Sequence, residues 1–421
     1  MDDTSGSAIK KPAPLSAAEQ EERLALTRAF PTSHDLRRRA QKLMPNFAFE
    51  YMDGGAGGHD NGIDRNWKAL DAVELVPRYG KVVEPPSATA RIFGQTYSAP
   101  IGIAPVGGPG TAYPGAERYL ARAAQKANVP YTLGLLSGID VEEGVQLAPD
   151  VLWYQLYRFS RDNHKIGLDL TRRAQAAGAK VLMLTIDTPI RTTRPREVRS
   201  GIVNPFRLTM RLRQDALMSP RWLSSLRRNG VPRFTALKPY MGGNLSLAEQ
   251  AAFIRREQGG AFTWDEVKLY RDVWKGPLMV KGILHPADAE KAVEIGCEGI
   301  LVSNHGGRQI EALPSSIDVL PAIAKQVKGR ATLVLDSGVR SGIDAARAVA
   351  LGADAALAGK SFLWALGALG ERGPAHLIHL YTEELRSTLG VLGCLNVDEL
   401  RDVPRRHPGA YQLKDFDPPA K

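Results

Sequence analysis

The stretch Gly299-Ile300-Leu301-Val302-Ser303-Asn304-His305-Gly306-Gly307-Arg308-Gln309 decides how the rest of the chain is interpreted. Its first residues are mostly apolar and end abruptly in a polar loop, as in a buried parallel strand that runs into a functional loop. The two glycines let the backbone approach a planar ligand. His305 is a titratable base, and Arg308 is a permanent cation suited to a carboxylate. Together they indicate proton abstraction next to an acid group, although a glycine-rich turn with a solvated histidine and arginine would have the same sequence.

The same pattern recurs along the chain from residue 99 onward: a short apolar run, a loop that opens on a special residue, and an amphipathic helix. The runs are Ala99–Pro105, Pro130–Leu133, Val151–Leu156, Lys180–Ile186, Pro277–Val280, Gly299–Val302, Ala331–Leu335 and Ala353–Leu357. Strands that alternate with helices in this number predict an α/β fold, a (β/α)₈ TIM barrel. An open doubly wound sheet is the alternative, but it usually has fewer repeats and one switch point.

Polar side chains follow several of these predicted strands. In a TIM barrel the catalytic residues lie at the carboxyl ends of the strands. Here those ends hold Tyr157, Asp187, Lys281, His305 and Asp336. Packing alone does not explain this density of polar groups, so the sequence predicts an active site at this end of the barrel.

The repeats are compactly spaced except between the fourth and fifth predicted strands. One helix is expected there at Thr263–Trp274, and residues 188–262 remain as an insertion after strand four. Loops of this length inside a compact domain are usually lids, binding elements or disordered segments.

The barrel domain is expected to span residues 36–395, with residues 396–421 as a C-terminal tail. Residues 1–35 are interpreted as an N-terminal helical extension with a short helix at Ala17–Phe30. The residues Ser33-His34-Asp35 resemble a helix cap before a helix that continues to Leu43.

Composition narrows the cellular setting. The chain has 421 residues and two cysteines, Cys297 and Cys394, which lie far apart and in no metal-ligand spacing. This argues against a disulfide framework or a metal site and fits a reducing compartment. The N-terminus has no apolar core typical of a signal peptide, and no apolar stretch is long enough to span a bilayer. We therefore expect a cytoplasmic protein that is not integral to a membrane.

The positive charge is concentrated in one part of the insertion. Between Thr188 and Tyr240 eleven arginines and Lys238 face only two acids, Glu197 and Asp215, whereas the whole chain has a net charge of +10. This segment carries the entire excess, so we expect a local surface that attracts anions.

Taken together, five loops resemble those of the FMN-dependent L-2-hydroxy acid dehydrogenase and oxidase family. This family includes glycolate oxidase, lactate oxidase and monooxygenase, and the membrane-associated lactate and mandelate dehydrogenases. The resemblance runs from about Leu36 to about Cys394. The matching residues, in order along the chain, are Gln155-Leu156-Tyr157, Thr185-Ile186-Asp187-Thr188, Val280-Lys281-Gly282, Ser303-Asn304-His305-Gly306-Gly307-Arg308-Gln309 and Asp336-Ser337-Gly338-Val339-Arg340.

The resemblance implies FMN-dependent oxidation of an L-2-hydroxy acid, lactate-like or larger, to a 2-oxo acid. Electrons would pass to a quinone or another acceptor, and the protein would form a homotetramer. An oxidase or monooxygenase that uses oxygen is the alternative enzyme. A barrel that binds an anionic ligand or a membrane without turnover is the alternative of another class.

The resemblance also implies roles for the polar residues. His305 would be the base, Asp187 would orient its imidazolium, and Tyr157 would donate to the substrate oxygen. Arg308, Arg194 and Tyr51 would hold the substrate carboxylate. Without the resemblance, the plain interpretation of Asp187 is a helix cap, and that of Tyr51 is a core aromatic residue.

The remaining strand ends would hold FMN, with Lys281 beside the N1–O2 edge of the flavin and the phosphate at the loops after strands seven and eight. The implied cofactor-binding residues are Ala104, Pro105, Val106, Gly107, Gly134, Gln155, Thr185, Lys281, Ser303, Asp336, Ser337, Gly338, Arg340, Gly359 and Lys360.

Three positions depart from the patterns of relatives. Lys360 replaces the usual arginine and offers a point charge instead of a bidentate fork. Gly107 stands where glycolate oxidase has alanine, which leaves the electron acceptor open. Leu136 stands where glycolate oxidase has a pocket tryptophan, which suggests a differently shaped pocket and disfavours glycolate.

The basic segment mixes its cations with Trp222 and with leucine and methionine side chains. This composition is typical of interfacial helices, and each cation near an anionic membrane contributes about 1 kcal/mol. Our hypothesis is peripheral attachment to the inner face of the cell membrane. A solvated lid is the plain alternative, and nucleic-acid binding is disfavoured because no recognised fold accompanies the charge.

Overall fold

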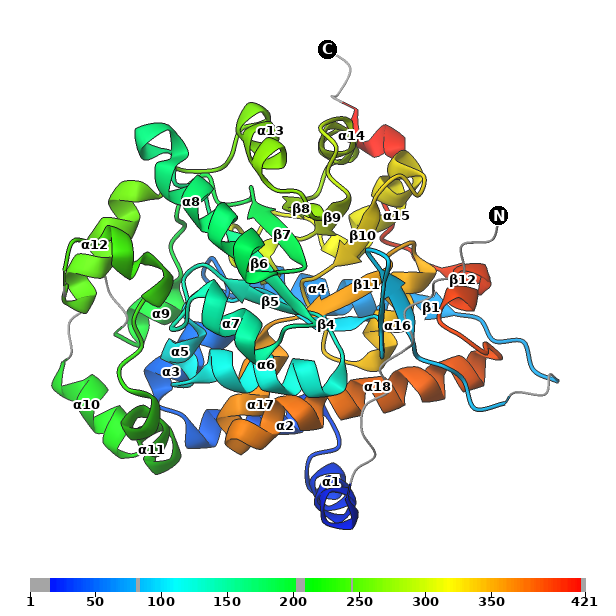
Figure 1. Ribbon diagram of the computed structural model, residues 1–421. Helices are drawn as coiled ribbons and strands as arrows, with labels where there is room; N and C mark the ends of the chain where they lie inside the picture. Colours follow the sequence, from blue (N-terminus) through cyan, green and yellow to red (C-terminus); the bar gives the residue numbers. More distant parts are fainter. Residues whose placement is uncertain (1–15, 81–83, 202–208, 244, 418–421) are drawn as a thin grey trace.

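The structure is a computed structural model that describes residues 16–80, 84–201, 209–243 and 245–417. Eight parallel strands form a closed barrel in the order β10-β11-β4-β5-β6-β7-β8-β9, and the predicted TIM barrel is confirmed (Figure 1). The strands are β4 (Ile101–Ile103), β5 (Tyr131–Gly134), β6 (Leu152–Leu156), β7 (Val181–Thr185), β8 (Leu278–Ile283), β9 (Gly299–Val302), β10 (Thr332–Leu335) and β11 (Ala355–Ala358).

The strands are buried because side chains fill the barrel on the inside and helices cover it on the outside. Every residue of β6 and of β7 is buried. The polar exceptions to these apolar runs lie near the carboxyl ends, where Gln155 pairs in register with Gly134, and Thr185 with Lys281. The barrel therefore presents its buried polar groups at one mouth.

A ring of helices surrounds the barrel (Figure 1). Its longest member, α18, packs along the outside and is capped at its C-terminus by Gly393, which adopts a left-handed conformation that glycine tolerates. The helices of the ring are α6 (Ala116–Ala127), α7 (Val141–Leu147), α8 (Arg161–Ala177), α13 (Trp264–Val273), α14 (Pro286–Glu294), α15 (Ser316–Val327), α16 (Gly342–Ala350), α17 (Lys360–Leu369) and α18 (Gly373–Leu392).

In the part of the chain that the structure describes, four helices precede the barrel. They are α1 (Ala17–Ala29), α2 (Ser33–Leu43), α3 (Asn46–Asp53) and α4 (Asn61–Asp71). The cap predicted at Ser33-His34-Asp35 lies one residue too far along, because the Thr32 side chain is the N-cap and forms a capping box with Asp35. Helix α2 packs on α17, with Leu36 and Ala40 fully buried. The interlocking of these helices joins the N-terminal region to the barrel core.

Two small sheets complete the described chain. The hairpin of β2 (Ala90–Ile92) and β3 (Gln95–Tyr97) places the Phe93 ring against the Trp153 ring, with a centroid distance of 5.6 Å. Strand β1 (Glu74–Leu75) pairs with β12 (Arg405–Arg406), so the C-terminal tail returns to the N-terminal half of the chain.

The described residues of the insertion between β7 and β8 form a set of short helices. It contains α9 (Pro195–Arg199), α10 (Met210–Leu217), α11 (Pro220–Asn229), the 3₁₀ helix η1 (Thr235–Tyr240) and α12 (Leu247–Glu257), which gather beside α3 and α5 (Pro109–Ala112) at one side of the barrel (Figure 1). Trp222 anchors α11, because its Nε1 donates to the Ala112 carbonyl at 3.0 Å and its ring meets the Phe47 ring edge-on. Arg207 and Leu208, which belong to the predicted interfacial segment, lie outside the described residues.

Candidate active site

A cavity of about 1500 Å³ opens at the carboxyl ends of the barrel strands. Its inner wall comes from the strand-end loops and its outer wall from α3, α4 and the insertion. Lys281, His305, Arg308, Asp336 and Lys360 all line it. The polar residues predicted at separate strand ends therefore share one site.

His305 and Asp187 form the central pair of the site. The imidazole Nδ1 lies 3.0 Å from both carboxylate oxygens of Asp187. Burial lowers the pKa of His305, so the neutral ring is favoured, with Nδ1–H donating to Asp187 and the lone pair on Nε2. Burial opposes ionisation of Asp187, but His305 and Lys281 outweigh it and lower the pKa of the carboxyl. The pair has the arrangement of an oriented general base.

The buried ammonium of Lys281 connects the neighbouring strands. Its Nζ donates to Ser303 Oγ at 2.6 Å and to Asp336 Oδ2 at 3.2 Å, and it lies 4.0 Å from Asp187 Oδ2. Burial disfavours the charged form, but Asp336, Asp187 and Tyr157 raise the pKa of Lys281 above its ordinary value. The side chain, which is 4% exposed, is therefore a cation fixed at the base of the cavity.

Hydrogen bonds hold together the loops that follow β9 and β10. Ser337 Oγ accepts hydrogen bonds from the backbone N–H groups of Asn304 and Gly306, at 3.2 and 3.0 Å, and donates to Asp336. His305 and Ser337 both have positive φ angles, which side-chain-bearing residues rarely adopt. Such strained backbone persists only where its surroundings hold it in place, and it is concentrated at functional sites.

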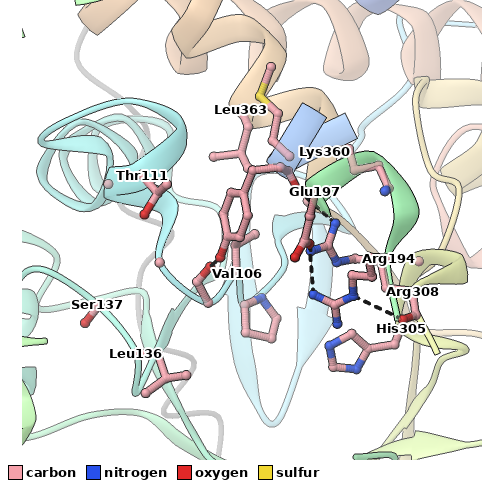
Figure 2. Close-up of a pocket in the computed structure, with 18 of the residues that line it drawn as sticks. Val106, Thr111, Leu136, Ser137, Arg194, Glu197, His305, Arg308, Lys360 and Leu363 are labelled. Atoms are coloured by element: carbon pink, nitrogen blue, oxygen red, sulfur yellow. Dashed lines mark hydrogen bonds and ion pairs between the residues drawn. The ribbon is translucent and has the colours of Figure 1, made fainter. Parts of the chain in front are cut away.

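An arginine cluster lies beside the histidine. The carboxylate of Glu197 accepts from Arg308 Nη2 at 2.6 Å and from Arg194 Nη1 at 3.2 Å, and Figure 2 shows it between these two side chains. Arg308 Nη1 also donates to the carbonyls of Tyr51 and Gly54, which fixes its orientation. Burial and the nearby Arg194 lower the pKa of Arg308. Arg191 Nη2 lies 3.8 Å from Glu197 Oε2 as well, so three guanidiniums share one carboxylate and the cluster keeps an excess of positive charge next to the base.

Two tyrosines line the same cavity with different surroundings. Burial, with a further contribution from Asp187, raises the pKa of Tyr157 to about 12, so its hydroxyl stays protonated and can donate. The Tyr51 hydroxyl donates to the Gly107 carbonyl, and the guanidinium of Arg308 lies 5.6 Å from the centre of its ring. Tyr51 thus contributes a cation–π contact to the arginine cluster.

The opposite wall suits a flat, anionic cofactor. Gly107 faces open space, because a Cβ added there would meet only Leu136, at 4.0 Å. Gln155 Nε2 donates to Thr185 Oγ1 at 2.9 Å behind this wall. Lys360 donates to the carbonyls of Asp53 and Gly54, and burial together with Arg308 lowers its pKa well below the ordinary value, so an anion beside it would favour its charged form. These groups fit the flavin ring and phosphate of FMN.

The structure brings most of the predicted site residues to the cavity surface. Those that line it are Tyr51, Ala104, Pro105, Val106, Gly107, Tyr157, Arg194, Lys281, His305, Arg308, Asp336, Ser337, Gly338, Gly359 and Lys360. Gly134, Gln155, Thr185, Asp187 and Ser303 stand directly behind this surface, in contact with lining residues or with each other.

Arg340 is placed apart from the other predicted cofactor residues. Its Nη2 donates to Asp71 Oδ1 at 2.6 Å, and its guanidinium lies over the Trp67 ring at 5.2 Å. Trp67 itself lines the cavity, so Arg340 is one side chain removed from it.

Sequence reasoning missed the partner of the arginines. In the sequence Glu197 is singled out only for its charge, yet Glu197 is 4% exposed and links Arg194 to Arg308. A signal was available, since Glu197 is one of only two acids in the basic segment. Arg196 was also missed: it forms ion pairs with Glu50, Asp53 and Asp60 and joins the insertion to α3.

Comparison with known proteins agrees with this site. The sequence profile of the FMN-dependent dehydrogenase family matches residues 40–405. The L-lactate dehydrogenases of Yersinia pestis (strain Pestoides F) and Yersinia pseudotuberculosis (serotype O:1b) are each 37% identical to this chain over 369 residues, which is 87% of this chain and 96% of each relative. The chain belongs to the FMN-dependent 2-hydroxy acid dehydrogenase and oxidase family, as the sequence motifs predicted.

Solved structures of the same family have the same fold. The monotopic membrane protein (S)-mandelate dehydrogenase matches with a TM-score of 0.83 at 30% identity, over 89% of this chain and 99% of that one. A mandelate oxidase with (S)-4-hydroxymandelic acid matches with a TM-score of 0.77 at 32% identity, over 90% of this chain and 99% of that one. The protein is thus an FMN-dependent oxidoreductase.

Proposed function

We propose that this chain oxidises an L-2-hydroxy acid to the 2-oxo acid at the mouth of the barrel, with His305 as the base, and passes the electrons to a quinone. The observation that carries the proposal is the position of His305 and Arg308 on one loop, with the imidazole held by Asp187 at 3.0 Å. A proton acceptor and a carboxylate anchor are thereby three residues apart and line the same cavity as Lys281 and Lys360.

The substrate carboxylate binds to Arg308 and Arg194. Both are permanent cations that line the cavity, and a guanidinium can hold a carboxylate through two parallel hydrogen bonds. Tyr51 supports this anchor by packing its ring against Arg308. An acid held here has its α-carbon next to the neighbouring imidazole.

His305 Nε2 removes the proton from the α-carbon. Asp187 keeps the ring in the required tautomer and stabilises the imidazolium that forms, the role of a carboxylate behind a histidine base. The protonated hydroxyl of Tyr157 donates to the substrate oxygen as charge develops there.

The substrate loses two electrons and two protons, and FMN, when bound, supplies the two-electron acceptor. Lys281 would lie at the N1–O2 edge of the flavin, where its fixed positive charge offsets negative charge on the ring. Gln155 and Thr185 would bond the pyrimidine side, and Ser337, Gly338, Gly359 and Lys360 would hold the phosphate. Arg340 would reach the phosphate only after leaving Asp71.

Anaerobic bleaching of the flavin by a panel of L-2-hydroxy acids tests this function. We expect reduction by at least one acid and none by the matching D-acids, followed by faster reoxidation with a quinone analogue than with oxygen. A flavin that no acid bleaches would overturn the proposed reaction. Peroxide formation at the rate of reduction would instead assign the oxygen-using alternative.

Peripheral membrane attachment through α10 and α11 is supported by the surface of the insertion. Met210 and Leu217 are each 68% exposed and Met218 is 84% exposed, although all three are apolar. The exposed Arg211, Arg213, Arg221, Arg227 and Arg228 surround them on the same two helices. Apolar side chains among cations are typical of interfacial helices. Within the described residues, no helix is both long and apolar enough to cross a bilayer.

Co-sedimentation with vesicles that contain anionic lipid tests this attachment. A variant with Met210→Ser and Met218→Ser, neither of which lines the cavity, should remain in the supernatant while the parent protein pellets. Substitution is preferable to deletion of the segment, because α11 is anchored in the core through Trp222. Equal partition of both proteins would refute membrane contact by these helices. Light scattering of the detergent-solubilised protein tests the proposed homotetramer.

A further inference from the structure

We infer that the outer half of the active-site cavity, beneath α10, α11 and α12, is a binding subsite for the apolar side chain of the substrate. This inference rests on the proposed function and adds the substrate class: an L-2-hydroxy acid with an extended aliphatic or aromatic substituent, in preference to lactate. The subsite, here called the outer chamber, is made by residues of the insertion and is continuous with the cavity that contains His305.

The outer chamber is lined mainly by apolar side chains. Leu212 is buried in α10, and Ile254 is buried in α12, so the chamber is roofed by packed side chains. Its apolar lining residues are Leu212, Ala216, Leu217, Trp222, Leu223, Leu226, Val231, Pro232, Phe234, Leu247, Ala251 and Ile254. A ligand group that enters it would exchange water for hydrocarbon, which favours an apolar substituent.

The cavity is also larger than a small hydroxy acid requires. Pockets for drug-sized ligands are typically about 300–1,000 Å³, whereas this cavity has a volume of about 1500 Å³. A cofactor held by Lys281, Ser337 and Lys360 would take up the inner part and leave the outer chamber open. The methyl group of lactate would not reach far into that space.

The position of the cations sets the orientation of the substrate. Arg308 and Arg194 hold the carboxylate at the inner end, so the rest of the molecule extends away from them. Val106, Leu136 and Ser137 line the same cavity (Figure 2). Gly107 lines it too and has no side chain to narrow it. The cationic Arg213, Arg233 and Arg255 line the outer part, where their charge attracts an anionic acid toward the cavity.

The chain offers a variant that fills the outer chamber and a matched control. Ala216 on α10 lines the chamber, so Ala216→Trp should occupy it. Gln214 is exposed on the same helix and does not line the cavity, so Gln214→Trp adds the same bulk elsewhere. Should Ala216→Trp fail to fold, Leu226→Trp on α11 fills the chamber from another side, with the exposed Ser224→Trp as its control.

The test is anaerobic flavin reduction in the FMN-loaded protein by unbranched L-2-hydroxy acids of three to ten carbons. We expect the second-order rate constant to rise about fourfold for each added methylene until the chamber is full. Ala216→Trp should abolish this rise while reduction by lactate persists, and Gln214→Trp should keep it. Binding of the corresponding 2-oxo acids, measured by calorimetry, should follow the same order.

Three results would overturn the inference. A rate constant that does not depend on chain length in the parent protein would show that the chamber does not receive the substituent, although bleaching itself would leave the proposed reaction intact. Slower reoxidation by a quinone analogue in Ala216→Trp, with unchanged reduction by every acid, would assign the chamber to the electron acceptor. Absence of bleaching by any acid would remove the proposed function as well.

Discussion

The mouth of the barrel and the insertion that covers it are built in different ways. At the mouth, Lys281, Ser303 and Asp336 are buried on or directly after rigid strands and bonded to each other. The insertion is a set of short helices, and Met210 and Met218 expose most of their surface. Chemistry that depends on fixed distances lies on the first region, because small displacements of reacting groups are costly. We propose that the second region sets the choice of substrate and the contact with the membrane.

Of the substitutions that test this comparison, loss of the base at the barrel mouth should have the largest effect, on the rate of flavin reduction. His305→Gln should reduce the rate of flavin reduction by about 10²–10⁴-fold, the usual contribution of a positioned general base. Bound FMN should be retained, because His305 is not among the groups proposed to hold it. Stopped-flow absorbance gives both quantities. His379→Gln, on α18 away from the cavity, is the control. Near-normal reduction in His305→Gln would assign the base elsewhere.

Glu197 joins the two regions, so its removal should disturb both. Glu197→Gln leaves the half-buried Arg308 and Arg194 without their shared carboxylate. Breaking a fully buried ion pair typically costs about 3–5 kcal/mol of the free energy of unfolding, so we expect a smaller loss for this half-buried cluster. A 2-oxo acid should restore part of this loss, because its carboxylate replaces the missing partner. Denaturant titration with and without pyruvate measures both effects.

The control for this variant is Glu197→Asp, which keeps the charge on a shorter side chain. It should retain most of the stability and gain little from pyruvate. If pyruvate stabilises Glu197→Gln no more than the parent protein, the two arginines do not form the carboxylate site.

A smaller effect is expected in the pH dependence of the base. Burial lowers the pKa of His305 from its ordinary 6.5, and Asp187 opposes this. Activity needs the neutral ring, so it should be complete above that pKa and fall as the pH drops through it, below pH 6.5. Asp187→Asn removes the opposing charge and should move this acid limb to lower pH. A limb that moves upward would contradict the assigned pair.

The smallest effect should come from the exposed face of the insertion. Met218→Ser should change the free energy of unfolding by no more than about 0.5 kcal/mol, as is usual for surface substitutions. Trp222→Ala, on the buried face of α11, should cost about 3–5 kcal/mol. Thermal melts compare the two. A large loss in Met218→Ser would mean that the residue packs against another part of the molecule.

The barrel could be predicted because its strands are buried on both sides and therefore read as apolar runs. The prediction for β9 is identical to the structure, whereas β8 continues beyond Val280 to Ile283. Lys281 and Gly282 interrupt the apolar run there, although Lys281 is a buried strand residue. A charged functional residue inside a strand thus makes the predicted strand end too early.

The ion pair between Glu197 and Arg308 could not be predicted in the same way. These residues are 111 positions apart, and their contact depends on how α9 folds back over the loop after β9. Arg340 illustrates the same limit, since its motif placed it with the cofactor residues while its side chain pairs with Asp71 on α4. Motifs identify residues at strand ends, but tertiary packing decides where long side chains point.

The register of β7 and β8 has a consequence for engineering. Thr185 pairs directly with Lys281, so the chain leaves one strand and returns on its immediate neighbour, whatever lies between. Chimeras that exchange the insertion between related enzymes should therefore still form a closed barrel, provided that the contacting residues around Trp222 and Arg196 are exchanged with it. Such an exchange would also replace Arg194 and Glu197, so it would alter the carboxylate anchor while His305, Lys281 and Asp336 stay in place.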